Sequence, residues 1–136
     1  MKALQECWRI LKPGGLLVLS FPTSNHYKDE YREENMYGLK VEVRNSKYFF
    51  QRFYDETAIQ KRILSNLDSY TIIGQRVYGE IYPNFFIEYE RRWQQYGIWE
   101  TVKDPYYMTK YFKEFKTIND VTGNLSITCL AIRKNL

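Results

Sequence analysis

The sequence contains no run of about eighteen apolar residues, which is the length that a membrane-spanning helix requires. Its first residues begin a charged segment and not the apolar stretch of a signal peptide. We therefore expect a soluble, cytoplasmic protein that does not enter a membrane. With 44% hydrophobic residues among 136, the chain has enough apolar material for one globular domain over residues 1–136.

Metal ligands are scarce. The only histidine is His26, and the two cysteines, Cys7 and Cys129, lie at opposite ends of the chain. A zinc site needs about four closely spaced Cys or His ligands, so we expect no metal. Each cysteine lies in an apolar periodic segment, which predicts buried, reduced thiols and no disulfide.

A strong charge of one sign is also absent. Twenty Lys and Arg against sixteen Asp and Glu give a net charge of +4. The excess is spread evenly, with eleven basic against nine acidic residues in 1–68 and nine against seven in 69–136. Binding of nucleic-acid phosphates requires clustered Lys and Arg, so this distribution argues against a nucleic-acid partner.

The N-terminal region shows a clear local pattern. Leu4, Trp8 and Leu11 form one apolar stripe, which predicts an amphipathic helix over residues 2–11. A proline and two glycines then predict a sharp turn. The continuous apolar run Leu16–Phe21 follows directly, and such a run is typical of a strand that is covered on both faces.

The pattern farther along the chain is mixed. Residues 22–53 are polar and tyrosine-rich, and we interpret them as a long loop insertion whose interleaved charges form a solvated helical face. Asp55 is a good N-cap for a helix over about residues 56–66. Strands are predicted over residues 70–78, with a bulge at Gly74, and over residues 125–132.

Residues 83–118 form a second, aromatic-rich insertion. Aromatic side chains recur there at intervals of three and four, which predicts two helices with aromatic faces. They include Phe85, Phe86, Tyr89, Trp93, Tyr96, Tyr107, Tyr111, Phe112 and Phe115, and Met108 shares a face with Phe112 and Phe115. These faces could stack on a flat or cationic ligand. Burial in the core or in an oligomer interface is the commoner role of such residues.

The N-terminal helix and strand, joined by the turn Leu11-Lys12-Pro13-Gly14-Gly15, resemble one segment of the class I S-adenosylmethionine-dependent methyltransferases. In that family this turn leads into the fifth strand of a mostly parallel, Rossmann-like sheet. The resemblance implies an α/β fold of about three main strands with flanking helices. Residues 16–21 would be strand five, 70–78 strand six, and 125–132 an antiparallel strand seven.

The part of the family that binds the cofactor has no counterpart in the sequence. Members hold S-adenosylmethionine on a glycine-rich turn after the first strand, with an acidic residue at the end of the second. The only adjacent glycines, Gly14 and Gly15, belong to the strand-five turn. The chain therefore resembles the C-terminal, substrate-side portion of a methyltransferase, and we expect it to be inactive in isolation.

The best candidate site follows strand five, where open α/β sheets bind their ligands; its residues are Thr23, Ser24, Asn25, His26 and Tyr27. His26 is a candidate base because imidazole accepts protons near neutral pH. The alternative is a surface histidine with a local hydrogen bond, since no partner residue is identifiable.

Three functions fit these patterns. The first is the substrate-side portion of a methyltransferase, and the second is a non-catalytic interaction subunit that keeps this scaffold. The third, a basic aromatic nucleic-acid binder, is the least supported. In the family, strand five lies between strands four and seven, so without strand four its edge is unpaired. We therefore expect a homo-oligomer, a swapped segment or a second chain at that edge.

Overall fold

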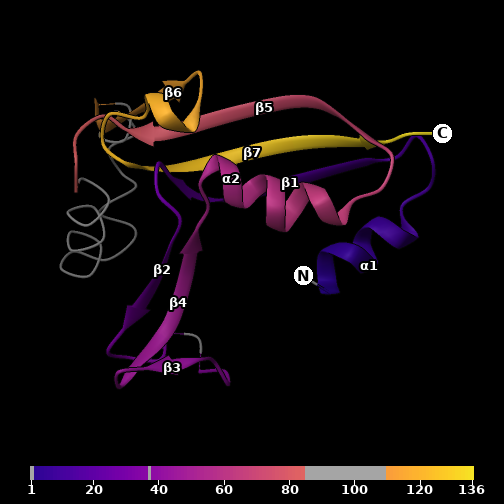
Figure 1. Cartoon of the computed structure of the whole chain (residues 1–136). Helices are drawn as coiled ribbons and strands as arrows, with labels where there is room; N and C mark the ends of the chain where they lie inside the picture. Colours follow the sequence, from indigo (N-terminus) through magenta and orange to yellow (C-terminus); the bar gives the residue numbers. More distant parts are fainter. Residues whose placement is uncertain (1, 37, 85–109) are drawn as a thin grey trace.

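The computed structural model describes residues 2–36, 38–84 and 110–136, and it has a mixed α/β fold with two antiparallel sheets (Figure 1). The elements in chain order are α1 (Lys2–Ile10), β1 (Leu16–Ser24), β2 (Lys28–Arg32), β3 (Val43–Arg44), β4 (Lys47–Phe53), α2 (Glu56–Ala58), a π-helical turn (Ile59–Ile63), a 3₁₀ turn (Leu64–Asn66), β5 (Tyr70–Glu80), β6 (Phe112–Phe115), a 3₁₀ turn (Ile118–Asp120) and β7 (Leu125–Lys134).

The main sheet has the order β1-β7-β5-β6, and all of its neighbouring strands are antiparallel. Because β7 runs against both β1 and β5, these two strands run in the same direction. Their carboxyl ends meet beside Leu125, at the start of β7: Ser24 pairs with Leu125, and Gly79 pairs with Ser126. The carboxyl ends of β1 and β5 thus lie at the same end of the main sheet.

The core lies between one face of this sheet and the helices. In Figure 1, α1 and the helical segment that begins with α2 both lie below the sheet. Trp8 of α1 is 3% exposed, and it packs in one cluster with Leu64 and with Leu130 and Ile132 of β7. The Trp8 indole also donates to Asp68 Oδ1 at 2.6 Å, so the buried N–H is satisfied.

The other face of β1 is not covered in the same way, and the prediction of burial on both faces was wrong for this strand. Leu17, Leu19 and Phe21 pack against the core, whereas Leu16 and Val18 are 49% and 64% exposed. Side chains alternate across a strand, and in the described part of the chain the helices lie on one side only.

The predicted helix, turn and strand at the N-terminus are confirmed. Gly14 has φ of +79°, which favours glycine, and its N–H donates to the Lys134 carbonyl at 2.8 Å. A Cβ on Gly15 would lie 2.8 Å from the Lys12 carbonyl oxygen, which accepts the Gly15 N–H, so the turn favours glycine there as well. The turn is therefore fixed against the end of β7.

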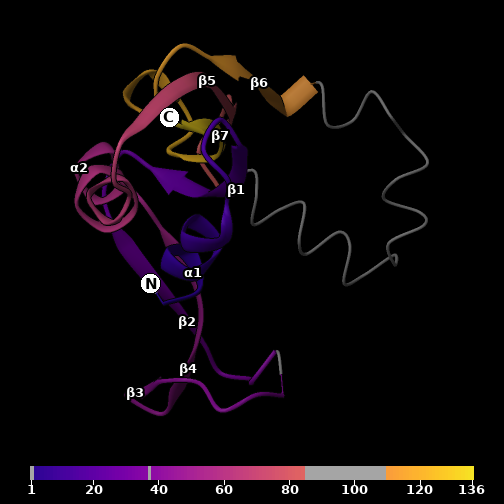
Figure 2. The same cartoon turned by 90° about the vertical axis from the view of Figure 1, so that its right-hand side faces the viewer.

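Residues 22–53 differ from the predicted loop with a helical face. Residues 22–24 continue β1, and β2, β4 and β3 form a three-stranded antiparallel sheet, which we call the arm (residues 28–53). The arm extends away from one end of the main sheet (Figures 1 and 2). Its polar side chains are cross-strand partners: Asp29 faces Arg52, and Glu30 faces Gln51.

Residues 56–66 are helical, as predicted. The Asp55 carboxylate accepts the Ala58 N–H at 2.7 Å, which is the expected N-cap. The following strand is also confirmed, and its register shifts between Ile72 and Gly74, where the bulge was predicted. It continues to Glu80, beyond the predicted end.

The helical interpretation of residues 83–118 was wrong over its last part. Phe112–Phe115 is strand β6, which pairs with Val77–Glu80 of β5. Long-range pairing prevailed there over the helical spacing of Tyr111 and Phe115. The aromatic residues of the predicted helices within 85–109 lie outside the described residues.

The thiols also differ in part from the prediction. Both are free, but Cys7 is exposed on α1 and Cys129 is half-buried in β7. Cys7 adjoins the apolar stripe of α1 without being part of it, so it faces solvent.

Candidate functional site at the carboxyl end of β1

The predicted site residues lie together where β1 ends and the arm begins. Thr23 and Ser24 are the last residues of β1 and are buried, while Asn25, His26 and Tyr27 connect β1 to β2. The chain returns to the same place after β4: Tyr54 accepts the Ser24 N–H and donates its own N–H to the Pro22 carbonyl, both at 3.0 Å. The end of β1 is thus held between the main sheet and the arm.

Three buried hydroxyls lie at this position. Thr23 Oγ1 is 2.7 Å from Ser126 Oγ and 2.9 Å from Thr128 Oγ1. Thr23 and Thr128 are fully buried and Ser126 is 5% exposed. Because these hydroxyls bond to one another and to the Thr23 carbonyl, their polar atoms are satisfied within the protein. They stabilise the junction of β1 with β7 and do not present a nucleophile.

His26 is exposed in the turn after β1. Its backbone N–H lies 3.5 Å from Ser24 Oγ, and no side-chain hydrogen bond of the imidazole is found among the described residues. A general base is ordinarily oriented by a second group. The geometry therefore favours the surface-histidine alternative that the sequence left open.

Tyr27 has a more constrained environment. Its N–H donates to Asp55 Oδ2 at 3.1 Å, so the carboxylate that caps the helix also holds this turn. The guanidinium groups of Arg52 and Arg62 lie 5.7 and 5.0 Å from the centre of its ring, which is cation–π distance. Tyr27 thus joins the arm to the helical segment.

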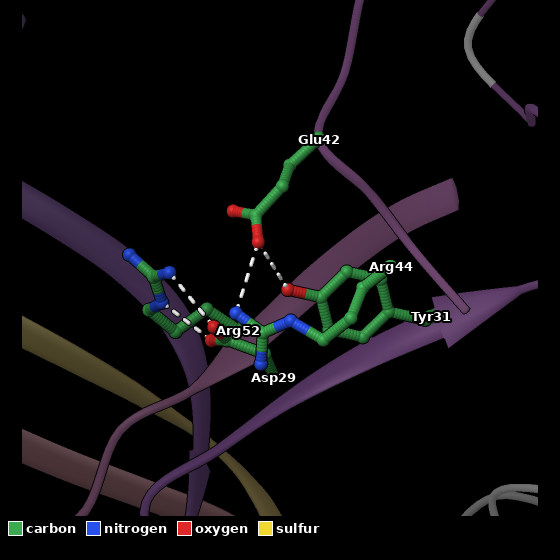
Figure 3. A network of polar contacts seen from close by, with 5 residues as sticks. All are labelled: Asp29, Tyr31, Glu42, Arg44 and Arg52. Atoms are coloured by element: carbon green, nitrogen blue, oxygen red, sulfur yellow. Dashed lines mark hydrogen bonds and ion pairs between the residues drawn. The ribbon is translucent and has the colours of Figure 1, made fainter. Parts of the chain in front are cut away.

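The arm carries a polar network that the sequence did not predict (Figure 3). Arg52 binds Asp29 with two hydrogen bonds, of 2.6 and 2.9 Å. This bidentate pair lowers the pKa of Asp29 below its ordinary value and raises that of Arg52. Glu42 accepts from the Tyr31 hydroxyl at 3.0 Å and from Arg44 at 2.9 Å.

Burial is the main cause that raises the pKa of Tyr31, and the hydrogen bond to Glu42 adds to the effect. The cations of the network are thus paired with carboxylates inside the arm. These ion pairs hold the three strands of the arm together. Because a carboxylate already neutralises Arg44 and another neutralises Arg52, neither guanidinium is well suited to bind an external anion.

An apolar hollow lies on the exposed face of the main sheet at the same end. Its floor is a row across three strands, in which Ile127 of β7 pairs with Pro22 of β1 and with Tyr78 of β5. The hollow encloses about 350 Å³, and its remaining walls are Gln51, Phe53, Phe112, Leu125 and Ser126. The sequence does not predict this hollow, because its walls come from five strands that are distant along the chain.

The glycine turn lies at the opposite end of the main sheet. Leu11–Gly15 precedes β1 and is bonded to Lys134, the last residue of β7. The turn therefore lies at the end of the sheet opposite to the carboxyl ends of β1 and β5. The described residues contain no group of three or more His, Cys, Asp or Glu side chains that could hold a metal ion.

No described helix is long and apolar enough to cross a membrane. No family model matches the sequence, and the comparisons with curated proteins and with solved structures give no match.

Proposed function

We propose that the chain is the substrate-side portion of an S-adenosylmethionine-dependent methyltransferase. The observation that carries the proposal is the placement of the Leu11–Gly15 turn, which joins an amphipathic helix to β1, beside an antiparallel β7. The resemblance implied this arrangement for strands five and seven. β5 follows a capped helical segment, as strand six would.

The described residues do not fit the cofactor. Gly14 and Gly15 are committed to the turn before β1, at the end of the sheet opposite to the carboxyl ends of β1 and β5. The proposal therefore requires the cofactor-binding half to come from sequence upstream of Met1 or from another chain. Transfer of a methyl group depends on positioning the acceptor against the sulfonium, so without that half we expect no activity.

The test is a calorimetric titration of S-adenosylhomocysteine into two proteins. One is the chain itself, and the other is the product of the same gene read from upstream codons through to Leu136. We expect no heat of binding from the chain alone and saturable binding from the longer product.

Two results would overturn the proposal. Saturable binding by the chain alone would show that the cofactor half is not missing. The second result has two parts, which together would remove the methyltransferase assignment. The upstream codons encode no glycine-rich strand-turn, and a photo-crosslinkable S-adenosylhomocysteine labels no complex that contains this chain in a lysate of the source cells.

One observation favours a second candidate, a non-catalytic interaction subunit. β1 is the edge strand of the main sheet, and among the described residues only its last part is bridged, between Thr23 and Tyr54. The unpaired part, Leu16–Phe21, can pair with a strand from another chain. This candidate predicts a stable complex in which no methyl transfer occurs.

A further inference from the structure

We infer that the hollow at the carboxyl end of β1 and β5 binds a small, uncharged, largely apolar molecule of about one or two rings. This inference goes beyond the proposed function, because it concerns binding by this chain and requires no cofactor. The hollow is lined by Pro22, Gln51, Phe53, Tyr78, Phe112, Leu125, Ser126 and Ile127.

The size of the hollow fits such a ligand. Small-molecule sites ordinarily measure about 300–1,000 Å³ and are lined mainly by apolar and aromatic side chains. The hollow, at about 350 Å³, is at the small end of that range. It has walls from two sheets, since Gln51 and Phe53 come from the arm strand β4 and the floor belongs to the main sheet. It is therefore a concave site and not merely an uncovered sheet face.

The chemistry of the walls selects the class of ligand. None of the lining side chains carries a charge at neutral pH. Three of the walls are aromatic: Phe53, Tyr78 and Phe112. Aromatic walls favour a flat apolar partner, because rings gain from edge and offset contacts beyond the area that they bury.

The polar atoms at the walls are largely committed elsewhere. Gln51 Nε2 donates to Glu30 Oε2 at 2.7 Å, and the Ser126 hydroxyl is bonded to Thr23. Tyr78, which is 46% exposed, offers its hydroxyl at the rim. A charged ligand would therefore lose hydration without compensating partners, whereas an apolar ligand would not.

The test is a fluorescence titration with 6-propionyl-2-(dimethylamino)naphthalene, a neutral two-ring probe whose emission shifts to the blue in apolar surroundings. We expect saturable, single-site binding to the full chain. Ile127→Asp places a carboxylate on the floor of the hollow and should weaken binding at least about tenfold. Ile127→Trp keeps the site apolar but fills it, and it should weaken binding to a similar extent.

Ile73→Asp is the matched control, because Ile73 is 44% exposed on β5 against 39% for Ile127 on β7, and Ile73 does not line the hollow. This variant should bind as the unmodified chain does, and circular dichroism of every variant checks the fold. The inference is overturned if the unmodified chain shows no saturable binding, if Ile73→Asp weakens it equally, or if a folded Ile127→Trp binds the probe undiminished. Any of these results would leave the methyltransferase proposal unaffected, since its test measures a different ligand.

Discussion

Gly123 packs tightly against the buried Glu80. Glu80 is fully buried at the end of β5, and its side chain accepts the Leu125 N–H at 3.1 Å. A Cβ on Gly123 would lie 2.5 Å from the Glu80 carbonyl oxygen, which accepts the Gly123 N–H. The backbone cannot move away without breaking that hydrogen bond.

We therefore expect Gly123→Ala to lower the free energy of unfolding by about 1–3 kcal/mol, as overpacking of a tight site does. Urea denaturation measures the change. Gly74→Ala is the control, because its Cβ would meet only Ala131 Cβ, at 3.9 Å, and alanine also restricts the unfolded chain. Equal destabilisation by both substitutions would contradict this account.

The Asp29–Arg52 pair makes the free energy of unfolding depend on pH in the acid range. The pair lowers the pKa of Asp29 below its ordinary value of 3.8, so the folded state binds that proton less readily than the unfolded state. Its contribution is therefore fully present well above pH 3.8 and is lost as pH falls through the lower pKa of the folded state. Asp29→Asn should remove about 1 kcal/mol at neutral pH and flatten the acid limb of stability.

Urea denaturation at a series of pH values tests this expectation. Glu6→Gln is the matched control, because Glu6 also pairs with an arginine, Arg9, but the two side chains are 60% and 70% exposed. Solvent screens that pair, and we expect the variant to follow the unmodified chain. An acid limb that is unchanged in Asp29→Asn would show that the arm network does not contribute to the folded state.

At the scale of elements, Asp55 joins two segments. One carboxylate oxygen caps the helical segment at Ala58, and the other holds the turn at Tyr27. Asp55→Ala removes both bonds and should lower the free energy of unfolding by about 1–2 kcal/mol. Asp55→Asn can still accept the Ala58 N–H and should lose less. Urea denaturation of the two variants measures the difference, and equal losses would refute the capping account.

The elements that the sequence predicted are those with local signals. The stripe of Leu4 and Trp8, the Asp55 cap and the Gly14 turn each act within a few residues, and each is present in the structure. The arm escaped prediction because its pairs are distant: Asp29 and Arg52 are 23 residues apart. A window of helical length cannot detect such pairing.

The candidate site follows the same division, because its local part was predicted from the sequence and its long-range part was not. The stretch after β1 is where the chain turns away from the sheet, as its position after a strand implied. The apolar hollow was not predictable, since Pro22, Tyr78 and Ile127 meet only through strand register. A shift of one residue in either pairing would turn these side chains to the opposite face.

At the scale of the whole molecule, the main sheet ends at an unprotected strand. Leu16–Phe21 of β1 has a free edge among the described residues, and Leu16 and Val18 are exposed beside it. Natural edges are ordinarily protected by charges, prolines or bulges, and the stretch Leu16–Phe21 contains no charged residue and no proline. We therefore expect the isolated chain to dimerise by pairing its β1 edge with the β1 edge of a second copy.

Sedimentation velocity over a range of concentrations tests this expectation. The unmodified chain should dimerise, and Val18→Lys should shift it to a monomer because a charge at the edge opposes strand pairing. Ile127→Lys adds the same charge to an exposed position of β7, where Ile127 pairs with Pro22 of β1 and with Tyr78 of β5, and it should leave the dimer intact. A monomer at every concentration, with freely exchanging amides in Leu16–Phe21, would exclude self-pairing. If the proposed cofactor half occupies this edge in the longer protein, that protein should be monomeric and unaffected by Val18→Lys, because the two partners compete for one row of backbone hydrogen bonds.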